Sequence, residues 1–397
     1  MNLRQRFAEA LMPNYGTVEL ALTHGEGAVV YDVDGKDYLD FIGGIATSVL
    51  GHAHPALVAA VGDQVAKIAH TSNLFINQPA VELAERLLGL FDVPGKVFFT
   101  NSGAEANECA LKLAMIHGRP DGRTRFVAAA DGFHGRTLGA LALTGKDVIR
   151  EPFAPFGVDV TFVPYGDVAA LAETVDHTVA AVFLEPLQGE AGVKPPPAGY
   201  LSTARTVCDN AGALLVLDEI QSGMGRTGAW FAHQQENVTP DVVTMAKGLA
   251  GGLPMGACIG LGPVGDLFGP GAHGSTFGGN PVSAAAALAV LDTIANDGLM
   301  DNAVTMGRRL VDGMAAMGHP LVQSVRGRGL WLGIVLNEEL AAPVVTSLRD
   351  RGVLANAVRP DVVRVAPPLI VTEADVDRFL LELAHAADVV YPRGGRP

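Results

Sequence analysis

Short apolar runs alternate with longer amphipathic stretches through the middle of the chain. The runs are apolar on both faces, which is typical of strands that are buried on both sides of a sheet. Helical stretches separate them, as crossover connections between parallel strands require. The runs cover residues 96–100, 125–130, 181–186, 214–218 and 242–247. The pattern therefore predicts an α/β domain with an open, mostly parallel sheet.

The two ends of the chain have a different pattern, which predicts a smaller α+β domain. Alternating apolar and polar residues flank Asp34 and Gly35, a hairpin signal. An alanine-rich helix is expected over 281–294, and after it come a helix, a strand through RGRGLWLGIVL, a helix over 341–351, a strand in VVRVAPPL and a closing helix from Thr372. We expect both ends to join in one small domain, made of residues 1–50 and 291–397, with residues 51–290 forming the large domain.

Charge and composition narrow the class of ligand. The chain has 28 Lys and Arg against 42 Asp and Glu, a net charge of −14. This balance argues against nucleic acid or an anionic membrane surface as the main partner, so a small metabolite is expected. Although 49% of the residues are hydrophobic, no apolar stretch is long enough for a membrane span, and the first residues do not resemble a secretory signal. We expect a cytoplasmic protein.

The cysteines do not indicate a metal site or a disulfide framework. Cys109, Cys208 and Cys258 lie far apart, with no CxxC or CxxH spacing. We expect all three to be buried as small apolar residues, and we expect no metal.

The first candidate site residues follow the ends of two predicted strands. Ligands of an open parallel sheet bind outside the carboxyl ends of its strands. Run 96–100 leads into Ser102 and Gly103, which begin a helix whose free N–H groups could hold a phosphate. Run 125–130 leads into Phe133 and Arg136, a stacking platform and a carboxylate-binding fork. The alternatives are a helix start without a phosphate, a packed phenylalanine and a salt-bridged arginine.

Two further runs end on opposite charges. Run 214–218 ends on Asp218, and an ionised carboxylate at the edge of a core needs a cationic partner. Run 242–247 ends on Lys247, where desolvation favours the neutral amine that a Schiff base requires. The alternative is an ordinary ion pair between these two residues at the sheet edge.

Ordered motifs along nearly the whole chain resemble those of the class (subgroup) III pyridoxal-phosphate aminotransferases. Within that family the sequence is most similar to the acetylornithine aminotransferases, particularly in LMPNYG, DFIGGIATSVLGHAHP and HTSNLFINQP. The resemblance implies the aspartate-aminotransferase type of fold, fold type I of the pyridoxal-phosphate-dependent transferases, with the cofactor in the large domain. The motifs shared with the whole family are NSGAEAN, FHGRT, FLEPLQGEAG, LLVLDEIQSGMGRTG, TMAKGLAGGLPMGA, HGSTFGGNP and VRVAPPL.

The resemblance assigns the cofactor ring to four residues. Asp218 keeps the ring nitrogen of pyridoxal phosphate protonated, so that the ring can withdraw electrons. Gln221 bonds the ring hydroxyl, and Phe133 stacks on the ring. Lys247 binds the cofactor covalently and, once a substrate displaces it, moves the proton between the substrate and the cofactor.

The resemblance also implies which residues bind the phosphate of the cofactor. Ser102, Gly103 and Ala104 hold it within one chain, and Thr276 reaches the phosphate of the neighbouring subunit. The implied active unit is a homodimer with shared active sites.

Five residues are implied to bind the substrates. Arg364 clamps the carboxylate next to the reacting carbon of glutamate or 2-oxoglutarate. Glu190 pairs with this arginine when the amine donor has no such carboxylate, because an unpaired buried cation is costly; a permanent pair is the alternative. Arg136 binds the distant carboxylate of both substrates, and Ser275 and Tyr15 line the same end.

Three neighbouring residues are given no chemical role. We expect Glu185 to be a structural partner of the pocket, Glu219 to be an ion-pair or supporting residue, and His134 to be a satisfied packing residue rather than a proton shuttle.

The implied reaction transfers the terminal amino group of N2-acetyl-L-ornithine to 2-oxoglutarate, a step of arginine biosynthesis. Ornithine, succinylornithine or 4-aminobutyrate as donor is the alternative within the family. A protein that keeps the cofactor without turnover is an alternative of another class, against which the intact site residues argue. A dehydrogenase is disfavoured, because no strand is followed by a complete GxGxxG motif.

Overall fold

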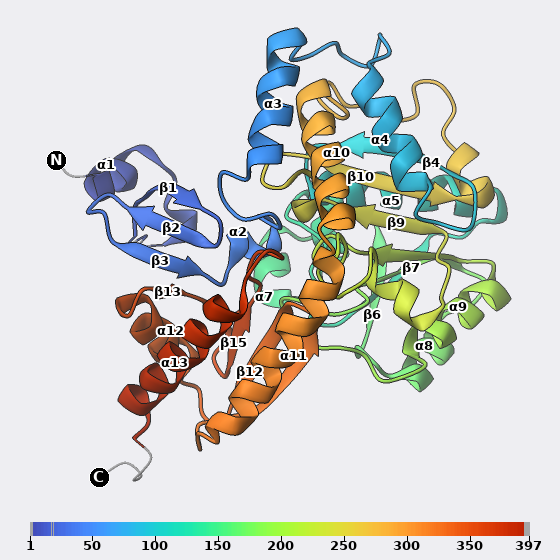
Figure 1. The fold of residues 1–397 in the computed structure, drawn as a ribbon. Coiled ribbons are helices and arrows are strands. Elements are labelled where there is room, and N and C mark those ends of the chain that lie inside the picture. The colour runs from blue at the N-terminus through green and yellow to red at the C-terminus, as the bar shows by residue number, and fades with distance from the viewer. Residues whose placement is uncertain (1–2, 17, 19, 393–397) are drawn as a thin grey trace.

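A seven-stranded sheet forms the centre of the molecule in the computed structural model, which describes residues 3–16, 18 and 20–392 (Figure 1). The strand order is β4-β10-β9-β8-β7-β5-β6. All pairings from β6 to β9 are parallel, whereas β10 runs antiparallel to both β9 and β4. The predicted α/β class with a mostly parallel sheet is confirmed. The strands are β4 (Gly95–Thr100), β5 (Arg125–Ala129), β6 (Asp159–Val163), β7 (Val179–Leu184), β8 (Leu214–Asp218), β9 (Val242–Met245) and β10 (Gly256–Leu261).

Two strands of this sheet were not predicted from the hydrophobic pattern. Strand β6 is a partly exposed edge strand, and β10 is the reversed one. Strand β10 contains two glycines, which weaken a strand signal. The structure needs both: a Cβ on Gly256 would lie 2.5 Å from Oγ1 of Thr100, and one on Gly260 would lie 2.9 Å from the backbone nitrogen of Gly265.

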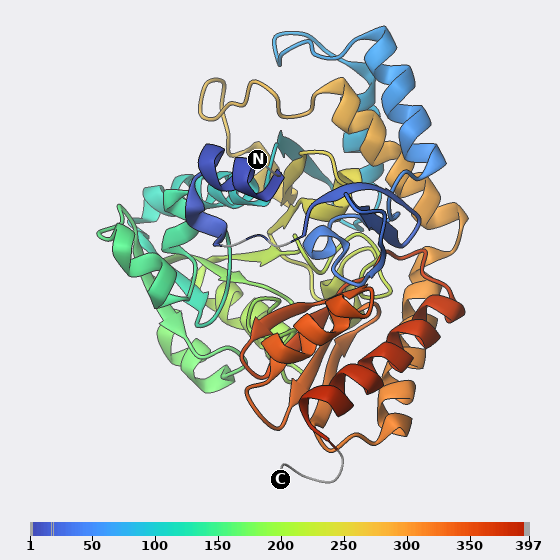
Figure 2. The same ribbon diagram turned by 90° about the vertical axis from the view of Figure 1, so that its left-hand side faces the viewer.

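Helices cover both faces of the sheet, and alternate residues of each strand face different layers. Phe126 and Val216 pack in the layer under α5 (Gly103–Gly118). Val127 and Leu215 pack in the opposite layer, under α8 (Val168–Thr174) and α9 (Tyr200–Ala211). This arrangement explains why the strands are apolar on both faces. Figures 1 and 2 show these helices around the sheet.

A third group of helices packs beside the β4 end of the sheet. Helix α10 (Pro281–Asn296) contacts α3 (Pro55–Lys67) and α4 (Gln78–Leu88), and the three stand together in Figure 1. The shorter helices are α1 (Leu3–Ala10), α2 (Gly43–Ala46), α6 (Leu138–Ala142) and α7 (Asp147–Arg150).

The two ends of the chain share a sheet. Strand β13 pairs in parallel with β3, so that Val353 lies opposite Leu39. The predicted hairpin around Asp34 and Gly35 is confirmed, since β2 and β3 pair in antiparallel fashion on either side of it. This sheet has the order β1-β2-β3-β13, and a third sheet has the order β11-β12-β15-β14. The strands are β1 (Leu22–Glu26), β2 (Val29–Asp32), β3 (Asp37–Asp40), β11 (Val322–Arg328), β12 (Trp331–Leu336), β13 (Val353–Leu354), β14 (Asn356–Arg359) and β15 (Val362–Val365).

Three C-terminal helices accompany these small sheets: α11 (Leu299–Met317), α12 (Ala341–Asp350) and α13 (Glu373–Val390). Figure 1 shows α10 followed by α11 as one long bent column between the two parts of the molecule. The predicted boundary after residue 290 lies inside α10, and the domain limits stay a prediction.

Among the described residues, no single helix has the length and apolar character needed to span a membrane; only α10 and α11 taken together, with a 66° bend, meet the criteria of length and composition.

The core of the central sheet should control stability. Leu215 in β8 is fully buried, so we expect Leu215→Ala to lower the free energy of unfolding by about 2–5 kcal/mol. The matched control is Leu381→Ala in α13, where the side chain is 54% exposed and the change should stay within about 0.5 kcal/mol. Urea unfolding with comparison of the midpoints measures both. Equal losses in the two variants would contradict this assignment of the core.

Candidate active site

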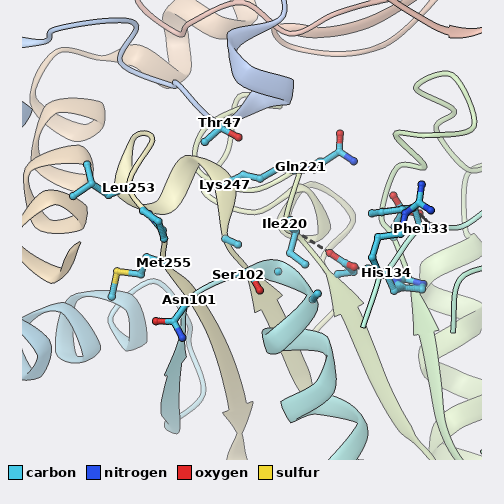
Figure 3. Close-up of a pocket in the computed structure, with 18 of the residues that line it drawn as sticks. Thr47, Asn101, Ser102, Phe133, His134, Ile220, Gln221, Lys247, Leu253 and Met255 are labelled. Atoms are coloured by element: carbon cyan, nitrogen blue, oxygen red, sulfur yellow. Dashed lines mark hydrogen bonds and ion pairs between the residues drawn. The ribbon is translucent and has the colours of Figure 1, made fainter. Parts of the chain in front are cut away.

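A cavity of about 400 Å³ lies at the carboxyl ends of the central strands (Figure 3). Its walls come from the segments that follow β4, β5, β8 and β9. Figure 3 shows Lys247 and Gln221 near the middle of the cavity, Ser102 at the start of α5, and Phe133 and His134 on one side. The sequence-predicted residues that line it are Ser102, Gly103, Ala104, Phe133, Arg136, Asp218, Gln221 and Lys247.

Asp218 is almost fully buried, at 4% exposure, and its carboxylate has three partners. Its Oδ2 accepts hydrogen bonds from Nδ2 of Asn107 and from Nδ1 of His134, each at 2.8 Å. Its Oδ1 accepts the backbone N–H of Ile220 at 3.0 Å. Asn107 is oriented in turn by Thr244, whose hydroxyl donates to Oδ1 of Asn107 at 2.8 Å. The carboxylate is therefore held in one orientation while keeping acceptor capacity toward the cavity.

His134 is buried as expected, but it is more than a packing residue. Burial opposes its protonation, yet the hydrogen bond and the negative charge of Asp218 outweigh this effect and raise the pKa of His134. Its Nε2 has no hydrogen-bond partner among the described residues. The expectation of a fully satisfied side chain is therefore wrong at one nitrogen.

Lys247 lies two residues after the end of β9, which is the strand next to β8 that ends on Asp218. Desolvation lowers the pKa of Lys247 to about 8, and the positive charge of Arg364 adds to this effect. The carboxylates of Glu190 and Asp218 act in the opposite direction. Its backbone has φ +41°, a left-handed conformation that costs about 1–3 kcal/mol for such a residue. The structure therefore presents a lysine amine that is easily deprotonated.

The start of α5 forms another wall of the cavity. Ser102 is the N-cap residue, and its hydroxyl accepts the backbone N–H of Glu105 at 3.2 Å. The first N–H groups of a helix have no partner within the helix, and those of Gly103 and Ala104 border the cavity. Gly103 packs closely against Ile220, whose Cδ1 would lie 2.7 Å from a Cβ at this position and would have to shift. The helix start is suited to bind an anion.

The expected pair of Glu190 and Arg364 is present. Nη1 of Arg364 donates to Oε1 of Glu190 at 2.6 Å and to Oε1 of Gln221 at 3.4 Å, and its Nη2 donates to Oδ1 of Asn356 at 2.8 Å. Burial raises the pKa of Glu190, but the charge and the hydrogen bond of Arg364 outweigh burial, so that the pKa is lowered overall. Arg364 is buried at 4% exposure, whereas the Glu190 side chain is 26% exposed.

The two remaining glutamates have structural surroundings, in agreement with the roles expected for them. Glu185 accepts the backbone N–H groups of Phe133 at 2.9 Å and of Gly189 at 3.2 Å, and burial raises its pKa to about 7. Glu219 accepts from the ring and the backbone of His233, at 2.8 and 2.9 Å. These bonds hold the backbone around the cavity.

Five predicted residues do not line the cavity within this chain. Arg364, paired with Glu190, reaches the lining residue Gln221, and the other three are Ser275, Thr276 and Tyr15. Ser275 is adjacent to the cavity, because its hydroxyl accepts from Nδ2 of Asn101 at 3.3 Å. Thr276 is exposed, and Tyr15 is 82% exposed. Arg136 does line the cavity, with its guanidinium 5.7 Å from the ring centre of Phe133.

Several residues of the site were missed in the sequence. Ile220 lines the cavity two positions after the end of β8, a place that the strand-end argument could have included. Asn107 interrupts the apolar face of α5 and could have been noticed for that reason. Thr47 and Met255 come from the segments around α2 and before β10, and no local pattern marks them.

The residues present fit pyridoxal phosphate. Phe133 and Ile220 offer apolar surfaces for a ring, the start of α5 offers N–H groups for a phosphate, and Asp218 offers a fixed carboxylate for a protonated ring nitrogen. Lys247 offers an amine with a lowered pKa for the aldehyde. Within the described residues, no cluster of three or more His, Cys, Asp or Glu side chains could hold a metal ion.

Comparisons with known proteins agree with this geometry. The acetylornithine aminotransferase of Mycobacterium tuberculosis is 57% identical over 388 residues, which cover 97% of this chain and 96% of that protein. Among solved structures, the N-acetylornithine aminotransferase of Stenotrophomonas maltophilia is 36% identical with a TM-score of 0.84, covering 95% of this chain and 98% of that chain.

An ornithine aminotransferase of Toxoplasma gondii has the same fold. It is 32% identical with a TM-score of 0.93, covering 97% of this chain and 94% of that chain, and its structure is described as having partial occupancy of PLP at the active site. The family model for class-III aminotransferases matches residues 11–387. The chain therefore belongs to the class-III aminotransferases, which have the predicted fold type I.

Proposed function

We propose that this aminotransferase moves the terminal amino group of N2-acetyl-L-ornithine to 2-oxoglutarate, giving N-acetyl-L-glutamate 5-semialdehyde and L-glutamate. The observation that carries the proposal is the contact between Glu190 and Arg364 at 2.6 Å beside Lys247. The names of the M. tuberculosis and S. maltophilia relatives support the choice of donor. The reaction is a step of arginine biosynthesis, and the expected cytoplasmic location stays a prediction.

The pair allows one site to accept two different substrates. N-acetylornithine reacts at a carbon that has no neighbouring carboxylate, so Glu190 stays on Arg364 and keeps the buried cation neutralised. Glutamate and 2-oxoglutarate react next to a carboxylate, which takes the place of Glu190 on the guanidinium. Arg136, at the exposed side of the cavity, is suited to the distant carboxylate of both substrates.

Pyridoxal phosphate, when bound, supplies the electron sink for carbanion formation. Asp218 would keep a proton on the ring nitrogen, because Asn107 and His134 fix its carboxylate and leave it acceptor capacity. Lys247 would hold the cofactor covalently and, once released, would carry a proton to or from the substrate carbon, for which its lowered pKa of about 8 is suited. Ser102, Gly103 and Ala104 would hold the phosphate, and Gln221 the ring hydroxyl.

We infer that the active unit is a homodimer. Thr276 and Tyr15 are exposed and lie outside the cavity of their own chain. Their implied roles therefore require a second copy, with Thr276 on the phosphate held by the partner subunit.

Free ornithine is the competing donor, because the T. gondii ornithine aminotransferase has the higher TM-score of the two solved structures, 0.93 against 0.84. Sequence identity favours the acetylated donor, at 57% for the M. tuberculosis relative. Succinylornithine and 4-aminobutyrate remain candidates from the family resemblance alone.

Single half-reactions distinguish these donors. The pyridoxal form of the protein is mixed in a stopped-flow instrument with N-acetylornithine, ornithine, succinylornithine, 4-aminobutyrate or glutamate, and the absorbance of the lysine-bound cofactor is followed. We expect fast conversion by N-acetylornithine and glutamate and at least about tenfold slower conversion by the others, equal to about 1.4 kcal/mol. Equal or faster conversion by ornithine or 4-aminobutyrate would change the proposed donor and leave the family unchanged.

The lowered pKa of Lys247 predicts the pH dependence of cofactor loading. Only the neutral amine reacts with an aldehyde, and the neutral fraction rises as pH passes the pKa, here about 8 instead of 10.5. The rate at which cofactor-free protein is loaded should therefore rise with pH and level off above a midpoint near pH 8, whereas the rate of a free alkyl amine should keep rising up to about pH 10.5. Lys247→Ala should bind the cofactor without the covalent link and should lose multiple turnover. A midpoint near 10.5, or retained turnover in Lys247→Ala, would contradict the assignment.

Removing the Glu190 side chain should slow the two half-reactions to different extents. In Glu190→Ala, Arg364 has no acidic partner while N-acetylornithine reacts, a situation that costs about 3–5 kcal/mol for a fully buried pair. We expect that half-reaction to slow by about a hundredfold or more, with a smaller loss for glutamate. Stopped-flow rates measure both, and Glu190→Gln is the control of similar shape. Equal losses would indicate a permanent structural pair instead.

A further inference from the structure

Glu190 lies between two cations. Its Oε1 accepts from Arg364, and its Oε2 lies 3.8 Å from Nζ of Lys146. The same ammonium group donates to the backbone oxygen of Glu190 at 3.0 Å. Lys146 is therefore anchored to the main chain of the glutamate while its charge faces the carboxylate.

Lys146 is well placed to influence a moving side chain. It precedes α7 and comes from a different segment from Glu190, and its side chain is 21% exposed. Burial lowers the pKa of Lys146 more than the nearby carboxylates of Glu190, Glu185 and Asp131 raise it, and Arg359 lowers it further. Among these carboxylates Glu190 has the largest effect on Lys146, and Lys146 is in turn the strongest cationic influence on Glu190 after Arg364.

Further hydrogen bonds hold Arg364 in place when a substrate arrives. Its Nη2 is held by Asn356 at 2.8 Å, and its Nη1 also reaches Gln221 at 3.4 Å. An incoming carboxylate would therefore displace Glu190 and not the guanidinium. The displaced glutamate would then be left beside another negative charge unless a cation received it.

We propose that Lys146 is the second docking point of Glu190. This inference rests on the proposed function, in which Glu190 leaves Arg364 for dicarboxylate substrates. When a ligand carboxylate occupies Arg364, the side chain of Glu190 turns toward Nζ of Lys146, and it turns back when the ligand lacks that carboxylate. Lys146 is thus a positioning residue that acts through Glu190 and sets how readily the site accepts dicarboxylates.

Two unreactive ligands test this with the cofactor-loaded protein. Glutarate has the two carboxylates of 2-oxoglutarate without the keto group, and N-acetylnorvaline is N-acetylornithine without its terminal amine. Isothermal titration calorimetry gives the Kd of each. We expect Lys146→Met to weaken glutarate binding by roughly threefold to fivefold, as for a partly exposed ion pair, and to change N-acetylnorvaline binding less than about twofold. Lys146→Arg, which keeps the charge, should keep the parent ratio of the two constants.

A double-mutant cycle with Glu190→Ala identifies the route of the effect. If Lys146 acts through Glu190, Lys146→Met should not change the Kd of glutarate in the Glu190→Ala background. Weakening of the same size in that background would mean that Lys146 contacts the ligand directly, and it would overturn the proposal. If Lys146→Met weakens the binding of glutarate and of N-acetylnorvaline equally, Lys146 only supports the structure of its loop. This result would also overturn the proposal.

A wrong choice of amino donor would be detected by a different experiment, the half-reaction with N-acetylornithine. If the parent protein does not react with N-acetylornithine, the proposed function is wrong, whereas the effect of Lys146→Met on the Kd of glutarate, measured with and without Glu190, still decides the role of Lys146.

Discussion

The site depends on one buried carboxylate that is held from three directions. Asp218 ends β8, Asn107 reaches it from α5, and His134 reaches it from the segment after β5. Because each partner belongs to a different element, these bonds fix the start of α5 relative to the strand ends. The N–H groups suited to a phosphate and the amine of Lys247 are thereby held around one cavity. If the carboxylate could rotate, the N–H groups and the lysine amine would no longer be fixed relative to it. The carboxylate also could not stay bonded to a ring nitrogen.

The charges around Lys247 explain how one cavity can take both kinds of substrate. Arg364 lowers the pKa of Lys247, and Glu190 opposes this effect. A substrate carboxylate that replaces Glu190 on Arg364 would bring the same charge to nearly the same place. The field at the lysine amine would therefore change little between the two half-reactions, provided that a nearby cation compensates the charge of the displaced glutamate. This requirement explains why a cation beside Glu190, such as Lys146, would matter for the reaction.

Positions at strand ends could be predicted from the sequence, because the apolar runs mark where each strand stops. This reasoning placed Asp218, Lys247 and Ser102 correctly at the cavity, and the family motifs added Arg364 and its partner. Pairing between distant segments could not be predicted in this way. The reversed direction of β10 and the bond from the lysine before α7 to a glutamate 44 residues later depend on tertiary packing and leave no periodic signal.

The surface around Thr276 gives the inferred homodimer a driving force. Asn73 donates to the backbone oxygens of Ser275 and Gly278, and this joins its loop to the segment that carries Thr276. Next to these bonds, large apolar side chains are left in solvent: Leu74 is 87%, Phe75 70%, Ile76 90% and Phe277 59% exposed. Such a concentration of exposed apolar residues is typical of an interaction surface. Burying it against a second copy would be favourable in itself, and the same contact would carry Thr276 toward the partner, so that assembly and completion of the phosphate site would be one event.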